Sequence, residues 1–212
     1  LVVAKTDPSQ GSRGTSLFMV DATSKGFSRG KNLKKVGMKA QDTSELFFQD
    51  MWVPATALLG EENSGFAYLM RELAQERLSV AIMAMASSEG ALAWTTDYVQ
   101  EREAFGRSIA KFQNTRFKLA EIATKVQVGR IFVDRCIEQH LRGELTVTTA
   151  AMAKLWSTEA QFEIMDECMQ LFGGYGYMIE YPIARAWADA RVQRIYAGTS
   201  EIMKELIARS VL

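Results

Sequence analysis

Two glycine-containing stretches near the C-terminus hold the residues whose types and spacing best suit ligand binding. One reads QLFGGYGY at 170–177, and the other reads YAGTSEI at 196–202. Glycine lets the backbone approach a ligand closely and adopt positive φ angles. Gly198 and Thr199 also open a predicted helix, whose first amide groups favour an anion. These stretches predict corners and a helix N-terminus presented to an anionic ligand, although glycines that merely end helices would give the same pattern.

A second group centres on Glu76, which the helical spacing places among apolar residues. The apolar stripe consists of Leu69, Leu73, Val80 and Met83. These residues recur at the spacing of one helix face, and Glu76 falls within the stripe, so we expect it to face a core. A carboxylate that faces a core is desolvated, which raises its pKa toward the neutral range that suits a general base. The spacing leaves open a buried ion pair of Glu76 with Arg102 or Arg77.

The segment REAFGR at 102–107 carries a cation and an aromatic ring at the predicted end of the same helix. Arg102 could hold a phosphate through two parallel hydrogen bonds, and Phe105 could lie against a planar ring. An arginine at a helix C-terminus also interacts favourably with the helix dipole without any ligand, so this segment alone does not establish a phosphate site. Gln113 at the start of the next predicted helix carries no signal by itself, and His140 at its end is explained as a solvated histidine.

Composition and charge exclude several classes of function. The 25 basic and 25 acidic residues give a formal net charge of zero, and without a basic stripe we expect no nucleic-acid partner. No apolar run approaches the roughly 20 residues that a membrane span needs. Cys136 and Cys168 lack ligand-like spacing, which indicates two reduced buried thiols and no metal site. The chain starts at Leu1 inside an apolar run, without a methionine or a targeting segment, so we expect a fragment that lacks an N-terminal part.

The elements that must position these residues change character near residue 60. Residues 1–60 contain short β-rich segments separated by turn residues, and the loop at 8–14 is expected to connect a hairpin. The expected strands are 1–4, 16–20 and 44–48. Residues 61–212 are expected to form five helices joined by short loops, which suits an antiparallel bundle. The expected helices are 64–103, 111–141, 146–172, 182–195 and 199–212. The predicted fold class is therefore mainly α, with a C-terminal antiparallel helical bundle at 61–212 preceded by part of a β-sheet domain at 1–60.

Five strings in this order resemble the acyl-CoA dehydrogenase family, in particular its long-chain branch. They are ERL at 76–78, REAFG at 102–106, QLFGGYGY at 170–177, EYPIA at 180–184 and YAGTSEIMKE at 196–205. The resemblance covers essentially the whole chain and implies a piece of the family's middle β domain followed by its C-terminal helical bundle. It also implies FAD as the cofactor, an acyl-CoA as the substrate, electron-transfer flavoprotein as a partner, and a homo-oligomer built as a dimer of dimers.

The resemblance assigns roles to the matching residues, with FAD lying between subunits. The implied FAD contacts are Arg102, Phe105, Gln113, Gln170, Gly173, Gly174, Thr199 and Glu201. The first three would reach the FAD of a neighbouring subunit, and Arg102 and Gln170 are expected to meet only between chains. Arg77 and Gly198 are the implied substrate contacts.

One departure from the family pattern bears on the catalytic base. Many members place a glutamate between the tyrosine and the glycine of the last string, where this chain has Ala197. The long-chain and isovaleryl branches instead carry the base directly before an arginine on the long helix, which is Glu76 here. The resemblance thus implies that Glu76 removes the α proton of an acyl-CoA thioester while the β hydrogen leaves as hydride to FAD. A main-chain amide near Ala197 would help acidify the α carbon.

Alternatives of two kinds stay open at this point. The first kind is another enzyme subtype, either an isovaleryl-like short-branched-chain dehydrogenase or an acyl-CoA oxidase. The second is a non-catalytic homologue with a role in assembly, although a scaffold would not need Glu76. We expect this chain by itself to be inactive, and a cytoplasmic location for a bacterial source or the mitochondrial matrix for a eukaryotic one.

Overall fold

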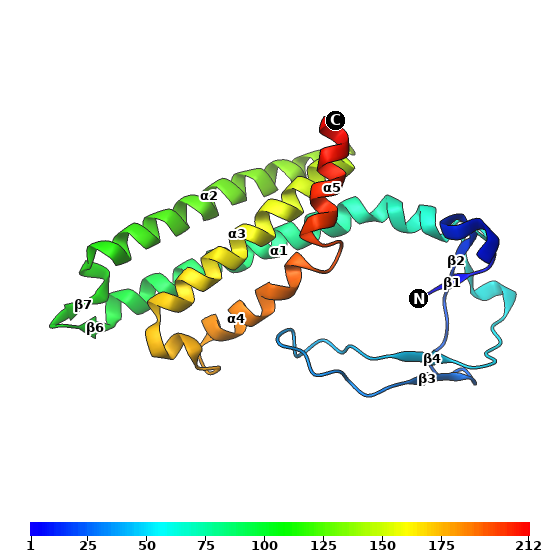
Figure 1. Cartoon of the computed structure of the whole chain (residues 1–212), viewed down its shortest axis with the longest axis horizontal. Coiled ribbons are helices and arrows are strands. Elements are labelled where there is room, and N and C mark those ends of the chain that lie inside the picture. The colour runs from blue at the N-terminus through cyan, green and yellow to red at the C-terminus, as the bar shows by residue number, and fades with distance from the viewer. The chain divides into compact units, whose positions relative to one another are not determined.

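The computed structural model describes all 212 residues, which form two compact units. The first unit comprises Leu1–Lys35 and Lys39–Leu73, and the second comprises Val36–Met38 and Ala74–Leu212. Helix α1 (Gly65–Glu101) begins in the first unit and continues through the second. Figure 1 shows the elements along the chain, coloured from blue at the N-terminus to red at the C-terminus.

The first unit is built on small antiparallel sheets. Strand β2 (Thr15–Phe18) lies between β1 (Val2–Lys5) and β5 (Leu58–Leu59). Strands β3 (Phe27–Arg29) and β4 (Leu46–Phe48) pair separately. The strands predicted at 1–4, 16–20 and 44–48 are therefore confirmed to within a few residues.

The connection between β1 and β2 confirms the predicted hairpin, but it is more ordered than a loop. It contains a 3-10 helical segment, η1 (Pro8–Gly14), where the carboxylate of Asp7 accepts a hydrogen bond of 3.0 Å from the amide of Ser9. Gly14 is required there, because a Cβ atom would lie 1.7 Å from the carbonyl oxygen of Asp7. A second short 3-10 segment, η2 (Ala55–Ala57), precedes β5.

The second unit is a helical bundle whose long helices run in alternating directions, with the C-terminal helix crossing them at a steep angle (Figure 1). Its helices are α1, α2 (Gln113–Leu141), α3 (Val147–Leu171), α4 (Pro182–Ala190) and α5 (Ser200–Val211). The short elements between them are β6 (Glu103–Ala104), β7 (Arg107–Ser108), η3 (Ile109–Lys111), η4 (Gly173–Tyr177) and η5 (Arg191–Arg194). The predicted fold class, mainly α with a C-terminal helical bundle after small sheets, is confirmed.

The ends of these helices follow from local chemistry. Thr146 caps α3 by accepting a hydrogen bond from the amide of Thr149 at 3.0 Å, as expected of a threonine at this position. Pro182 occupies the first turn of α4, where its missing amide hydrogen costs nothing. The helix predicted at 182–195 is shorter than expected, because the chain tightens into the 3-10 segment η5 after Ala190.

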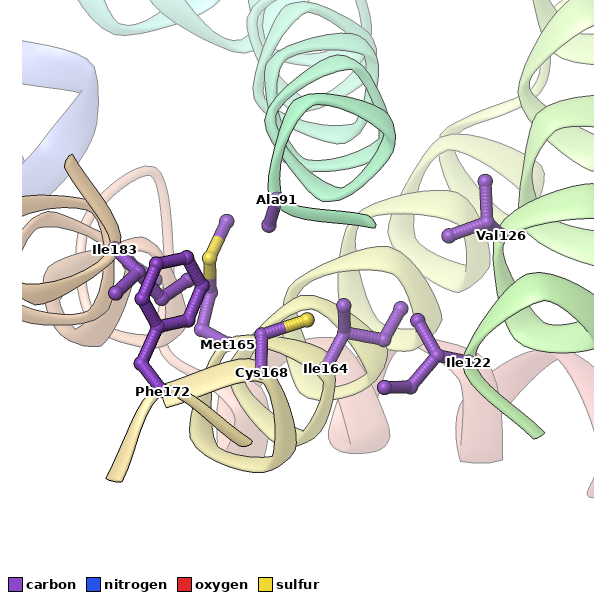
Figure 2. Packing of buried hydrophobic residues seen from close by; sticks show 9 residues of the cluster. Ala91, Ile122, Val126, Ile164, Met165, Cys168, Phe172 and Ile183 are labelled. Carbon is purple, nitrogen blue, oxygen red and sulfur yellow. The ribbon is translucent and has the colours of Figure 1, made fainter. Parts of the chain in front are cut away.

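The core of the second unit consists of two apolar clusters. The larger cluster brings together α1, α2, α3 and α4, and Figure 2 shows Met165, Cys168 and Phe172 packed near Ile183. The other cluster joins α1, α2 and α3 and includes Leu78, Met85, Val133 and Ala153. Two ion pairs of 2.6 Å on the outside also link α2 to α3, between Lys118 and Glu167 and between Lys125 and Glu163.

Both cysteines are free thiols buried in the second unit. No group of three or more histidine, cysteine, aspartate or glutamate side chains is arranged to hold a metal ion. None of the helices combines the length and apolar character that crossing a membrane would require.

We predict that residues 61–212 fold without the preceding strands. Both apolar clusters lie entirely within 74–212, so removing residues 1–60 takes away no member of either. The shortened chain should give a helical far-UV circular dichroism spectrum and unfold cooperatively on heating, with the 212-residue chain as the control. A spectrum dominated by unordered chain would contradict this prediction.

Candidate functional site

A cleft of about 500 Å3 lies at the end of the bundle where α1 and α3 both terminate. Its lining residues are Tyr98, Arg102, Ile109, Gln170, Leu171, Phe172, Gly173, Gly174, Tyr175 and Met178. Four of the eight residues predicted to bind FAD, Arg102, Gln170, Gly173 and Gly174, are thus brought together. The strings REAFG and QLFGGYGY form one concave surface.

The meeting of Arg102 and Gln170 within one chain corrects the expectation that they come together only between chains. The reason lies in the topology of the bundle. Because α2 separates α1 from α3 in an up-and-down arrangement, α1 and α3 run in the same direction. Their C-terminal ends therefore lie at the same end of the bundle, and Arg102 and Gln170 follow from those ends.

Arg102 is held in the cleft by backbone and aromatic contacts. Its amide donates to the carbonyl oxygen of Tyr98 at 2.8 Å, and its guanidinium lies 5.6 Å from the ring centroid of Tyr175. No carboxylate forms an ion pair with Arg102, which leaves its guanidinium hydrogens available. An arginine in this state can bind an anion bidentately.

The aromatic wall of the cleft is ordered by stacking. The rings of Tyr98 and Phe172 are stacked with centroids 4.2 Å apart, and the hydroxyl of Tyr98 donates to the carbonyl oxygen of Phe172 at 3.1 Å. Burial raises the pKa of Tyr98 above its ordinary value, so this hydroxyl keeps its proton. Tyr175 stacks in turn on Tyr181, with centroids 5.1 Å apart.

The glycines of η4 meet two different requirements. Gly173 has φ of 59°, a left-handed conformation in which a side chain is strained, and a Cβ atom on Gly174 would meet nothing within 4 Å. By contrast, a Cβ on Gly176 would lie 2.3 Å from the carbonyl oxygen of Met169. Gly176 thus allows the chain to pack on α3, whereas Gly173 and Gly174 leave exposed backbone beside Arg102. An anionic ligand with a planar ring, as FAD has, fits this combination of unpaired arginine, open backbone and aromatic rings.

Phe105 and Gln113 lie outside the cleft. Phe105 and Gly106, with φ of 52° and 76°, form the two-residue turn between β6 and β7, the geometry of a tight hairpin. The Phe105 side chain is 95% exposed at the tip and touches Phe112 edge-on, with ring centroids 6.2 Å apart. Gln113 is the exposed first residue of α2. Both roles stay predictions, since neither side chain shares a pocket with Arg102.

Glu76 does not face the core of this chain, which corrects the expectation from its apolar stripe. The carboxylate is exposed, Met83 of the stripe is 40% exposed, and the buried residues next to Glu76 are Arg77 and Leu78. The buried face of α1 comprises Arg77, Leu78, Val80, Ala81, Ala84, Met85, Ser88, Ala91, Thr95 and Val99, and Val80 at its edge is the one stripe residue among them. This face lies about 100° around the helix from the stripe, by the rotation of one residue. The stripe therefore does not mark the buried face, which mixes small residues such as Ala81 with large ones such as Leu78 and Met85.

The alternative of a buried ion pair is also wrong, since neither Arg77 nor Arg102 pairs with a carboxylate. Arg77 is only 6% exposed, and its Nε atom has no hydrogen-bond partner. Burial lowers the pKa of Arg77, and the neighbouring charge of Glu76 opposes this shift. A buried guanidinium with an unused donor indicates a group that is not yet satisfied within this chain.

The second glycine stretch forms a corner between η5 and α5, at Ala197–Thr199. Ala197 and Gly198 are both left-handed, with φ of 53° and 97°. The Thr199 side chain caps α5 by accepting from the amide of Ile202 at 3.3 Å. Glu201, in the first turn of α5, has a lowered pKa because its own amide and the Thr199 hydroxyl donate to its carboxylate. The corner thus combines strained backbone with a capped helix start.

Lys154 links α3 to this corner. Its side chain is fully buried, and its Nζ atom donates to the carbonyl oxygen of Gly198 at 2.7 Å. Burial and the nearby positive charge of Arg77 lower the pKa of Lys154 to about 8. The influence of Arg77 means that the turn of α1 carrying Glu76 and Arg77 lies near the corner.

Sequence reasoning missed Lys154 and Tyr98. Lys154 is the one charged residue between 147 and 158, and a lone charge in such a run was a usable signal. Tyr98 precedes Arg102 by four residues, one helical turn, so the position of Arg102 could have indicated it. Lys154 and Gln170 are 16 residues apart on one helix, so the corner and the cleft are separated by about 24 Å along α3.

Comparison with known proteins identifies the family. Residues 63–212 match the acyl-CoA dehydrogenase C-terminal domain. The whole chain is 53% identical to the mitochondrial long-chain specific acyl-CoA dehydrogenase of Sus scrofa. It is 38% identical to a subunit of the caffeyl-CoA reductase–Etf complex of Acetobacterium woodii, of which it covers 56%. The crystal structure of an acyl-CoA dehydrogenase from Geobacillus kaustophilus superposes on the whole chain with a TM-score of 0.97 at 52% identity, the chain covering 56% of that protein.

The chain spans about half the length of the curated relatives it matches, 50% for the pig protein. The family match nevertheless extends over the greater part of this chain and includes the cleft, Glu76 and the corner. The acyl-CoA dehydrogenases are FAD-dependent oxidoreductases. On the strength of its sequence and its bundle, this chain belongs to the acyl-CoA dehydrogenase family.

Proposed function

We propose that this chain is part of an FAD-dependent dehydrogenase that converts a long-chain fatty acyl-CoA to the trans-2-enoyl-CoA. The observation that carries the proposal is the cleft, where an unpaired arginine faces open glycine backbone between aromatic rings. The 53% identity to a long-chain specific acyl-CoA dehydrogenase supports the choice of substrate class.

In this proposal the cleft holds the phosphate-bearing part of FAD. Arg102 supplies the charge, while Gln170, Gly173 and Gly174 supply hydrogen bonds and close backbone approach. Phe105 at the hairpin tip, together with Gln113, reaches toward the FAD of a neighbouring subunit. Thr199 and Glu201 contribute from the start of α5, about 24 Å away along the bundle by helical rise. That separation suits residues that touch different ends of a cofactor, or two cofactor molecules in one oligomer.

Glu76 is proposed as the base that removes the α proton of the thioester. Ala197 occupies the alternative position for a base and has no titratable group. Glu76 is exposed, hence open to a ligand, and the adjacent Arg77 lies close enough to Lys154 at the corner to affect its pKa. A backbone amide at the corner donates to the thioester oxygen as negative charge develops there. Arg77 orients the base or holds the pantetheine, and Gly198 lets the substrate approach. FAD, when bound, supplies the acceptor for the hydride from the β carbon.

Partners and assembly follow from the same proposal. Electron-transfer flavoprotein would take the electrons, and one relative is named as a subunit of a complex with such a protein. A homo-oligomer, arranged as a dimer of dimers, would bring exposed Phe105 to a neighbouring subunit. A eukaryotic source would place the protein in the mitochondrial matrix, as the name of the pig relative indicates for that protein, and a bacterial source in the cytoplasm.

We predict that Glu76→Gln in the full-length gene product abolishes dehydrogenation while FAD stays bound. Loss of a positioned general base slows a reaction by roughly 10²–10⁴-fold. Bleaching of the flavin absorbance by a long-chain acyl-CoA measures the rate. Glu72→Gln is the matched control, because Glu72 is exposed one helical turn earlier on α1 and forms no ion pair. Bleaching at the wild-type rate in Glu76→Gln would refute the assignment of the base.

The base should also be transferable between the two positions. We predict that the double change Glu76→Gly with Ala197→Glu recovers part of the activity lost in Glu76→Gly alone, since both positions are proposed to reach the same α carbon. The same bleaching assay compares the double and single variants. Equal rates in the two would show that a carboxylate at 197 does not reach the substrate.

A further prediction concerns Arg102 in the cleft. Arg102→Ala should weaken FAD retention by roughly 10- to 150-fold, the effect of losing about 1.5–3 kcal/mol of charge-assisted hydrogen bonding, and should weaken substrate binding less. Equilibrium dialysis of FAD measures the change. Arg209→Ala near the end of α5 is the control, because its side chain is 73% exposed and pairs only with Glu205. Unchanged FAD affinity in Arg102→Ala would exclude the cleft as the phosphate site.

A further inference from the structure

We propose that Lys154 is a positioning residue that aims the corner Ala197–Thr199 at its ligand by holding the carbonyl oxygen of Gly198. The positioning role is inferred from the geometry of the corner alone, whereas its consequence for catalysis rests on the proposed function above. Lys154 is distant in sequence from the corner and reaches it from α3 with a hydrogen bond of 2.7 Å.

Burying this lysine is costly, which indicates that its contact serves a purpose. The side chain is 0% exposed and forms no ion pair. An ammonium group has three hydrogens to donate, and its transfer out of water is unfavourable unless it is paired. The charged groups that act on it are Arg77 of α1, Glu159 of α3 and Glu201 of α5. Glu159 is already engaged at 2.6 Å by both Arg194 and Ser200.

The geometry of the peptide bond turns this contact into a direction for the next amide. The bond between Gly198 and Thr199 is trans, as no cis peptide bond occurs in the chain. In a planar trans peptide the C=O and the N–H point in opposite directions. Since the carbonyl points toward buried Lys154, the Thr199 amide points the opposite way, and it donates no hydrogen bond within the chain. Lys154 thereby presents a free donor at the corner.

The corner needs such an anchor because its backbone is strained. Ala197 and Gly198 have φ of 53° and 97° in succession, and a non-glycine residue in the left-handed region costs free energy. Without the lysine contact, this peptide could rotate toward ordinary backbone angles. The Thr199 amide would then lose its direction, although α5 keeps its cap through the Thr199 hydroxyl.

Because Lys154 carries a charge, its hydrogen bond to Gly198 should depend on pH, an effect that packing alone would not produce. Its pKa of about 8 means that the ammonium loses its proton in mildly alkaline solution. A neutral amine still donates, but a hydrogen bond from a charged donor is roughly twice as strong. The hold on the Gly198 carbonyl should therefore weaken as the pH rises through 8, because the neutral amine is the weaker donor.

The first experiment follows the corner in the 212-residue chain without any ligand. The carbonyl ¹³C chemical shift of Gly198 is measured by NMR from pH 6 to 10 in wild type, Lys154→Arg and Lys154→Met, with Lys125→Met as the surface control. We expect a titration near pH 8 in wild type and in Lys125→Met, and none in the two Lys154 variants. A Gly198 shift that is independent of pH in wild type, or that titrates equally in Lys154→Met, would overturn the proposal. If a variant does not fold, the wild-type titration still tests the proposal, because a Gly198 shift that is independent of pH would overturn it.

The second experiment measures the consequence for catalysis in the full-length gene product. Lys154→Met should lower kcat/KM for a long-chain acyl-CoA by roughly tenfold, the loss of one charge-assisted contact, and Lys154→Arg should restore most of it. The wild-type rate should fall above pH 8, and that decline should be absent in Lys154→Arg. An unaltered kcat/KM in Lys154→Met would overturn the catalytic consequence. If wild type has no acyl-CoA activity while Gly198 titrates, the proposed function fails and the positioning role stands.

Discussion

The packing of α3 against α2, α4 and α5 is the constraint on which the rest of the second unit depends. The small buried side chains of α3 leave room for these neighbours; they include Ala150, Ala153, Ser157 and Ala160. Toward α1 the contact is made by side chains, including a bond of 2.5 Å from the side-chain amide of Gln161 to the hydroxyl of Ser87. Because α5 packs on α3, Lys154 of α3 can reach the corner before α5. The stacked rings of Tyr98 and Phe172 hold the ends of α1 and α3 beside each other at the cleft.

Close packing also appears where α2 joins these helices. Gly129 is buried on α2, and a Cβ atom there would lie 2.4 Å from Trp156 and 2.6 Å from Met85. Such distances cannot be accommodated without displacing a large side chain from the core. The three long helices therefore behave as one solid unit, and the cleft lies at its end, whereas Lys154 acts from its interior.

Much of this arrangement could be predicted from the sequence, and the failures share a physical cause. Caps, prolines and glycines mark helix ends locally, so the positions of the helices were predicted to within a few residues. Which face of α1 is buried could not be predicted from apolarity, because Leu73 and Met83 look more like core residues than Ala81 or Ser88 do. The burial of Lys154 depends on how α3 meets α1 and α5, which no local pattern encodes. Arg102 and Gln170 were expected to meet only between chains, and their meeting within one chain follows from helix direction, a property of the whole bundle.

The length of α3 has a consequence for how this protein can change over evolution. Lys154 and Gln170 lie on one uninterrupted helix, so inserting or deleting a single residue between them would rotate one relative to the other by about 100° and shift it by about 1.5 Å. The corner anchor and the cleft would then no longer face their present surroundings. Substitutions can accumulate on the outer face of this segment, but the number of residues between Lys154 and Gln170 cannot change. The turn around Gly143, where φ is 69° and a Cβ would meet nothing within 4 Å, can change length without disturbing either site.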